Sequence, residues 1–264
     1  MNANIYKIEI AWLLAQGGSW LLVLARVAGL AWLAPAWGTP GLGWRIRLGL
    51  AVLLTAVLVP VVGPYVTAPT SIVVLFRASL AEALVGAALG WTAALVVAGA
   101  RQAGEIVGTQ AGLSPASLLD PEVSDGLTPF GHLYGLIALA LFLALDGPLA
   151  LVGALVDSYR AVPVGGLPMT AQMATETFGQ VGQALALALR AAAPVALALA
   201  LAGMAIGLLG RAAPTFQFMA LALPARAAIG LVLVLLGLMT LAATLMAAWA
   251  SQPMLGPMLS TSTS

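Results

Sequence analysis

Few residues in this 264-residue chain could do chemistry. There is one histidine, His132, and no cysteine, which excludes disulfides, thiolate and His-rich metal sites, and cysteine nucleophiles. The ten bases are scattered singly, so nucleic acid would meet no basic stripe, and an intramembrane enzyme lacks the clustered acids or histidines that it would need at membrane depth. We therefore expect no enzyme, no cofactor and no metal site.

The composition indicates which elements must position the few polar groups. Hydrophobic residues make up 62% of the chain and charged residues 7%, against about 25% in a soluble domain. This balance excludes a soluble globular enzyme, and it also excludes disorder, which needs low hydrophobicity. We predict an all-α, polytopic helical membrane protein that forms one helical domain over residues 1–264.

Apolar stretches divide the chain into five to seven helices, and six is the count we expect. An uncleaved first helix covers about 10–36, because this stretch is too long for the apolar core of a signal peptide. The next stretches are 48–66, which Pro60 and Pro64 end or kink, and 72–112. A helix over 72–112 would be about 60 Å long and must protrude from a bilayer core of about 30 Å, tilt or break. The remaining stretches are 131–155, 179–210 and 227–250, and we expect the tail 251–264 to fray.

Two interruptions stand out in this pattern. Asp146-Gly147-Pro148 is a turn signal inside 131–155, so that stretch is either one kinked helix or a short re-entrant hairpin. Residues 113–130 form the longest polar, non-periodic stretch, with three prolines and three acids. Loops of this length are usually functional or disordered.

Glycines recur at helical spacing. Gly104, Gly108 and Gly112 share one helix face, as do the pairs Gly86/Gly90 and Gly203/Gly207. Small residues four apart allow two helix backbones to approach closely in a membrane. We therefore predict close helix packing at the series 104, 108 and 112.

Three charged residues fall inside apolar stretches: Arg26, Glu82 and Arg190. A charge at membrane depth costs about 2.5–3.5 kcal/mol on insertion scales and usually faces a partner or water. A lined conduit or proton relay is one interpretation; a structural ion pair or a snorkelling arginine is the other, and we favour the second. Glu82 could pair with Arg26 or with Arg77, and Arg101 could pair with Glu105 one turn along a helix.

Four stretches in order carry a family resemblance: 24–54, with a Gly/Pro connector and an arginine pair; 104–126, a glycine-spaced helix end and an Asp-Pro loop; 143–165; and 209–238. With them the chain resembles the FliR family, the export-gate membrane subunit of flagellar type III secretion, whose injectisome relatives are called SctT.

The resemblance implies a function and a set of partners. FliR-like subunits assemble with FliP-like and FliQ-like subunits into a helical export gate built of helix hairpins, with FlhB-like and FlhA-like proteins nearby, in the bacterial inner membrane at the flagellar basal body. Unfolded substrates pass through its centre. A loop within 113–129 helps to close the pore, which assigns that role to Leu113, Ser114, Pro115, Ala116, Ser117, Leu118, Leu119, Asp120 and Pro121.

Two alternatives stay open at this point. The chain could belong to a virulence injectisome, although the loop looks more flagellar. It could also be a small-solute transporter, whose site would lie on broken helices at Pro194 or at Asp146-Gly147-Pro148.

Overall fold

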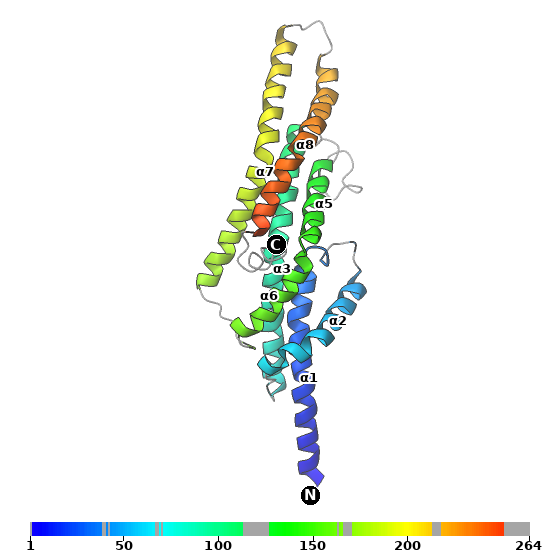
Figure 1. Ribbon diagram of the computed structural model, residues 1–264, viewed down its shortest axis with the longest axis vertical. Coiled ribbons are helices and arrows are strands. Elements are labelled where there is room, and N and C mark those ends of the chain that lie inside the picture. Colours follow the sequence, from blue (N-terminus) through cyan, green and yellow to red (C-terminus); the bar gives the residue numbers. More distant parts are fainter. Residues whose placement is uncertain are drawn as a thin grey trace. The chain divides into compact units, whose positions relative to one another are not determined.

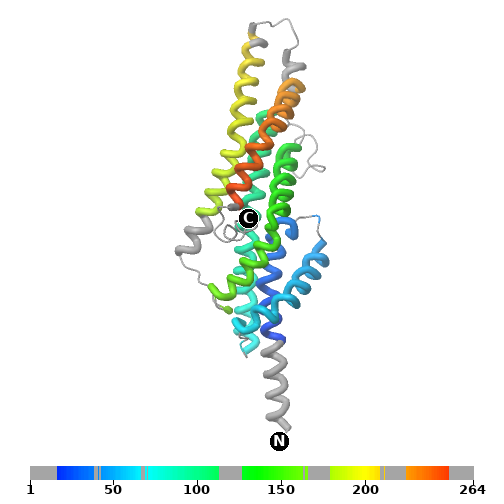
Figure 2. The backbone as a smooth tube through the Cα atoms, viewed as in Figure 1, coloured from blue at the N-terminus to red at the C-terminus, as the bar shows by residue number. Residues whose placement is uncertain are grey.

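The computed structural model describes residues 2–38, 41, 43–66, 69, 71–112, 127–162, 164–165, 171–212 and 218–250. Within these ranges only the backbone is described for 2–16, 171–178, 209–210, 212, 218–223 and 250 (Figure 2). Every regular element in the described part is a helix, as the composition predicted, because alanine and leucine dominate these stretches and favour helix. The chain divides into two compact units.

The first unit lies within residues 1–94 and 145–177. It holds α1 (Asn2–Leu33), α2 (Trp44–Val62), the short 3-10 helix η1 (Gly63–Tyr65), the first part of α3 (Ile72–Gln110) and α6 (Gly147–Ala161) (Figure 1). Helix α2 packs along α1 and touches α6. It ends at Val62, two residues before Pro64, so the predicted stop is confirmed, whereas Pro60 lies within the helix.

The second unit contains residues 95–144 and 178–251. It holds the rest of α3, helix α5 (Pro129–Ala144), most of α7 (Ala171–Ala212) and α8 (Phe218–Ala250). Helices α5 and α8 pack together, and Phe142 lies 4.8 Å from the fully enclosed Trp249, centroid to centroid. Gly237 of α8 brings that helix close to Val195 of α7, since a Cβ there would lie 2.8 Å from Val195 Cγ2.

In the described part of the chain, four helices are long and apolar enough to cross a membrane, and the broken pair α5 and α6 makes up to five. The four cover Trp44–Tyr65, Ile72–Gln110, Gly179–Leu208 and Pro224–Trp249. The polytopic helical class is thus confirmed. The predicted count of six holds if α5 and α6 are taken as one helix broken at Asp146, whose φ of 53° lies in the left-handed region.

Several predicted boundaries were wrong. Helix α1 begins at Asn2 rather than at about 10. Helix α7 begins at Ala171 rather than at 179, because its polar first turns form helix without contributing to the apolar pattern. Helix α8 begins at Phe218, so part of the predicted connector 211–226 is helical. Pro224 lies within this helix. Proline is tolerated in such helices, where neighbouring helices compensate for the lost hydrogen bond.

Candidate functional site

Glycines bring α1 and α3 into backbone contact within the first unit. A Cβ at Gly86 would overlap the carbonyl oxygen of Arg26, and one at Gly90 would lie 2.7 Å from the carbonyl oxygen of Leu30. From the other side, a Cβ at Gly29 would lie 2.8 Å from the backbone nitrogen of Ala87. Both helices therefore need glycine at this crossing, as expected for association in a membrane.

This close approach places a fully buried ion pair at the crossing. The Nε of Arg26 donates to Oε2 of Glu82 over 2.6 Å, and neither side chain has exposed surface. Of the two arginines that the sequence offered to Glu82, the structure thus selects Arg26. Arg77 is exposed on α3.

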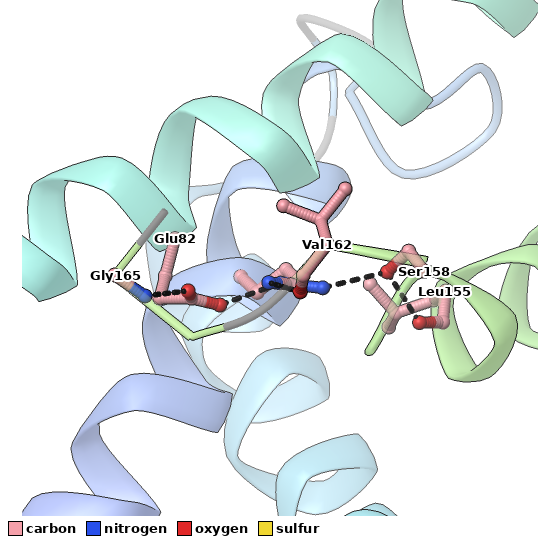
Figure 3. A network of polar contacts seen from close by, with 6 residues as sticks. Glu82, Leu155, Ser158, Val162 and Gly165 are labelled. Carbon is pink, nitrogen blue, oxygen red and sulfur yellow. Dashed lines mark hydrogen bonds and ion pairs between the residues drawn. The ribbon is translucent and has the colours of Figure 1, made fainter. Parts of the chain in front are cut away.

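The ion pair continues into α6 and the segment after it (Figure 3). The Nη1 of Arg26 donates to the hydroxyl of Ser158 over 2.9 Å, and its Nη2 reaches the carbonyl of Val162 over 3.4 Å. Its guanidinium also stacks 4.0 Å from the ring centroid of Tyr159. One side chain of α1 therefore contacts α3, α6 and the residue that follows α6.

The remaining carboxylate oxygen of Glu82 is also satisfied. Its Oε1 accepts the backbone N–H of Gly165 over 2.9 Å, and Gly165 has a φ of +75°, a conformation that favours glycine. A buried pair tolerates burial only when further hydrogen bonds satisfy both ions, and removing one partner typically costs about 3–5 kcal/mol. This network therefore fixes the first unit, and hydrogen bonds engage both of its ions.

A second joint lies within the second unit, where it connects the later part of α3 to the start of α5. A Cβ at Gly104 would lie 2.7 Å from the Cα of Gly131, and one at Gly108 would lie 2.6 Å from the Cβ of Thr128. The structure thus places two of the three predicted glycines against the same short segment. The third, Gly112, lies just after α3 and has a φ of +80°. Its N–H donates to the carbonyl of Thr109.

Glu105 lies on the same part of α3 and completes this joint. Its Oε1 accepts the backbone N–H of Thr128 over 2.6 Å and the Thr128 hydroxyl over 3.1 Å. The expected ion pair with Arg101 does not form between these two described residues, because Glu105 turns to α5 instead. Sequence reasoning missed Thr128, since only the course of the chain between α3 and α5 brings it to Glu105.

Metal or acid–base chemistry finds no support in the part of the chain that is described. There, no three His, Asp or Glu side chains could hold a metal ion together. His132 is exposed on α5, and the ion pair of Asp157 with Arg160 is exposed and long, at 3.6 Å.

Comparison with known proteins decides the family. Residues 18–251 match the family described as bacterial export proteins, family 1. The chain belongs to this family. It is 33% identical to the flagellar biosynthetic protein FliR of Escherichia coli K12 over 201 residues, which is 74% of this chain and 76% of that protein.

Two further relatives define the range of the family. The FliR protein of Caulobacter vibrioides is 32% identical over 206 residues, which cover 74% of this chain and 78% of that protein. The Yop proteins translocation protein T of Yersinia pestis is 28% identical over 179 residues, covering 66% and 68%. The predicted FliR resemblance is thus confirmed, and the chain is a multi-pass membrane subunit of a flagellar type III export apparatus.

The remaining predicted site residues of this export protein belong neither to the ion-pair network nor to the joint between α3 and α5. Arg190 was expected to be buried, but its side chain is exposed on α7. Arg190 and Arg211 bracket the charge-free stretch 191–210, whose length of about 20 residues matches one membrane crossing, so both suit the ends of a span. The predicted pore-closing residues Leu113–Pro121 lie outside the described residues.

Proposed function

We propose that this export protein is a wall subunit of a gated channel, without enzymatic activity of its own. It assembles with FliP-like and FliQ-like subunits, with FlhB-like and FlhA-like proteins nearby, and unfolded substrates pass through the assembly. The family match over residues 18–251 carries this proposal. The flagellar relatives, at 32–33% identity, favour a flagellum over an injectisome, whose relative shares 28%.

The dimensions of the helices support a place inside a larger complex. Helix α3 has 39 residues and α7 has 42, which correspond to about 58 and 63 Å of helix and exceed a bilayer core of about 30 Å. Large apolar side chains are exposed on α2, α3, α7 and α8, among them Phe76 at 72%, Leu236 at 74% and Met239 at 87%. Partner subunits and lipid together would cover these faces.

The joint between α3 and α5 supports the proposed role of residues 113–121. The chain leaves the end of α3 at Gly112 and returns to it at Thr128. Thr128 contacts Gly108, which lies one helical turn before Gly112. Both flanks of the intervening segment are therefore anchored at one end of α3. In our proposal the leucines and small residues of 113–121 close the pore to ions by excluding water, without binding any ion.

Deletion of residues 113–119 tests this function. The deleted chain, co-expressed with the neighbouring export subunits, should still assemble but should leak ions across the inner membrane. Deletion of 255–261 in the C-terminal tail serves as a control of equal length. An assembled complex that keeps its permeability barrier would refute the gate, and failure of the unaltered chain to co-purify with FliP-like and FliQ-like subunits would refute the assembly.

A further inference from the structure

In the hairpin of α7 and α8, residues 177–250 include basic residues but no acid. Arg190, Arg211 and Arg226 lie between residues 178 and 250, and no acidic residue follows Glu176 in the sequence. Arg190 and Arg211 are exposed, as suits arginines at the ends of a span, whereas Arg226 is half-buried. Arg226 is thus the arginine of this hairpin whose environment needs another explanation.

The guanidinium of Arg226 lies on Gly203 of the neighbouring helix. A Cβ at Gly203 would overlap Nη2 of Arg226 and would lie 3.1 Å from its Cζ. Gly203 belongs to the charge-free stretch 191–210, about two helical turns from Arg211. Because Gly203 has no side chain, the Arg226 guanidinium can lie against α7 inside an apolar stretch, where an unpaired charge is costly.

Arg226 has no partner among the described residues of this chain. Its Nε is buried and makes no hydrogen bond there, and no described carboxylate pairs with it. Buried guanidinium donors are normally satisfied, so the Nε of Arg226 lacks the partner it needs among the described residues.

The surface next to Arg226 is open to a close approach. Gly207 lies one turn beyond Gly203 on the same face of α7, and a Cβ there would meet nothing within 4 Å. The flanking side chains Met204 and Leu208 are 61% and 66% exposed. A glycine between exposed apolar side chains allows a second helix to come near enough for a short acidic side chain to reach Arg226.

We propose that the face of α7 and α8 around Gly207 binds a membrane helix of a neighbouring export subunit, and that a carboxylate of that helix pairs with Arg226. Arginine suits this role because its planar fork can hold a carboxylate with two hydrogen bonds. The inference rests on the proposed assembly and names the chemistry of one contact in it.

The test compares Arg226→Gln with Arg211→Gln, a matched control in the same hairpin. Each variant is co-expressed with the neighbouring export subunits, and the complex is purified in mild detergent. We expect Arg226→Gln to reduce the recovered complex about tenfold or more, because the partner carboxylate then stays buried and unpaired, while Arg211→Gln has no effect. Equal recovery for the two variants overturns the inference and leaves the proposed assembly intact.

A charge exchange separates a partner contact from simple misfolding. Arg226→Glu is combined with substitution to arginine of each acid in the membrane helices of the partner subunits, one at a time. Recovery of the complex with one of these substitutions identifies the pair. If none restores it, or if Asp120→Asn, Glu122→Gln and Asp125→Asn in this chain reproduce the loss, the carboxylate does not come from a partner and the inference fails.

Discussion

Arg26 and Ser158 are 132 residues apart in the sequence, yet Nη1 of the arginine donates to the serine hydroxyl over 2.9 Å. The same hydroxyl donates to the carbonyl of Leu155 over 2.6 Å, so the serine connects the arginine to the backbone of α6. Helix α6 is therefore held in the first unit by a polar contact with α1 in addition to apolar packing.

Arg26→Lys should destabilise the chain although it keeps the charge. Lysine lacks the planar fork and cannot contact Glu82, Ser158 and Val162 together, so about 2–3 kcal/mol of stability should be lost. The measurement is the thermal unfolding midpoint of the purified protein in detergent. Arg160→Lys is the control, because its ion pair is exposed and should contribute little. Equal midpoints for wild type and Arg26→Lys would show that the network does not stabilise the fold.

Glu82→Gln should cost more stability than the removal of both ions together. The single change leaves a buried guanidinium without its counter-ion, whereas the double variant Arg26→Met, Glu82→Met replaces the pair by apolar side chains of similar length. Thermal unfolding of Arg26→Met, Glu82→Met and the double variant forms a double-mutant cycle, and Glu82→Gln is measured beside it. Strictly additive losses would contradict direct coupling between the two residues.

Some of this architecture could be predicted from the sequence. The limits of α3 were predicted closely, since polar residues follow its last apolar turn. The ion pair was predicted only as one of two options, because the crossing of α1 and α3 depends on Gly29 and Gly86 each lying against the backbone of the other helix. Likewise, the spacing of Gly203 and Gly207 showed only that they share a face, and the structure places the Arg226 guanidinium against Gly203. Spacing identifies residues on one face, but not the partner that covers that face.

Gly108→Leu should disrupt the joint between α3 and α5. The new side chain would occupy the space of Thr128, whose Cβ lies 2.6 Å from the position that a Cβ at 108 would take, so the start of α5 would have to move. Overpacking of this kind costs about 1–3 kcal/mol or more. Swimming motility and recovery of the export complex should both fall. The control is Gly182→Leu on α7, where a Cβ would meet nothing within 4 Å. Wild-type motility and recovery for Gly108→Leu would refute the need for close approach.

Thr128→Val should loosen the proposed gate without blocking assembly. Valine keeps the shape of threonine, but it loses the hydroxyl that donates to Glu105 over 3.1 Å and accepts the N–H of Gly131 over 3.2 Å.

The backbone N–H of Thr128 still reaches Glu105 in this variant, so the joint is weakened rather than lost. Glu105→Leu removes the acceptor of both bonds and should have the larger effect. The measurement is ion leakage through assembled complexes in the inner membrane, with the leak expected to increase from wild type to Thr128→Val to Glu105→Leu. If deletion of 113–119 leaks but neither point variant does, the joint does not position the gate. If the point variants leak but the deletion of 113–119 does not, the barrier lies at the joint between α3 and α5. The joint would then close the pore without residues 113–119.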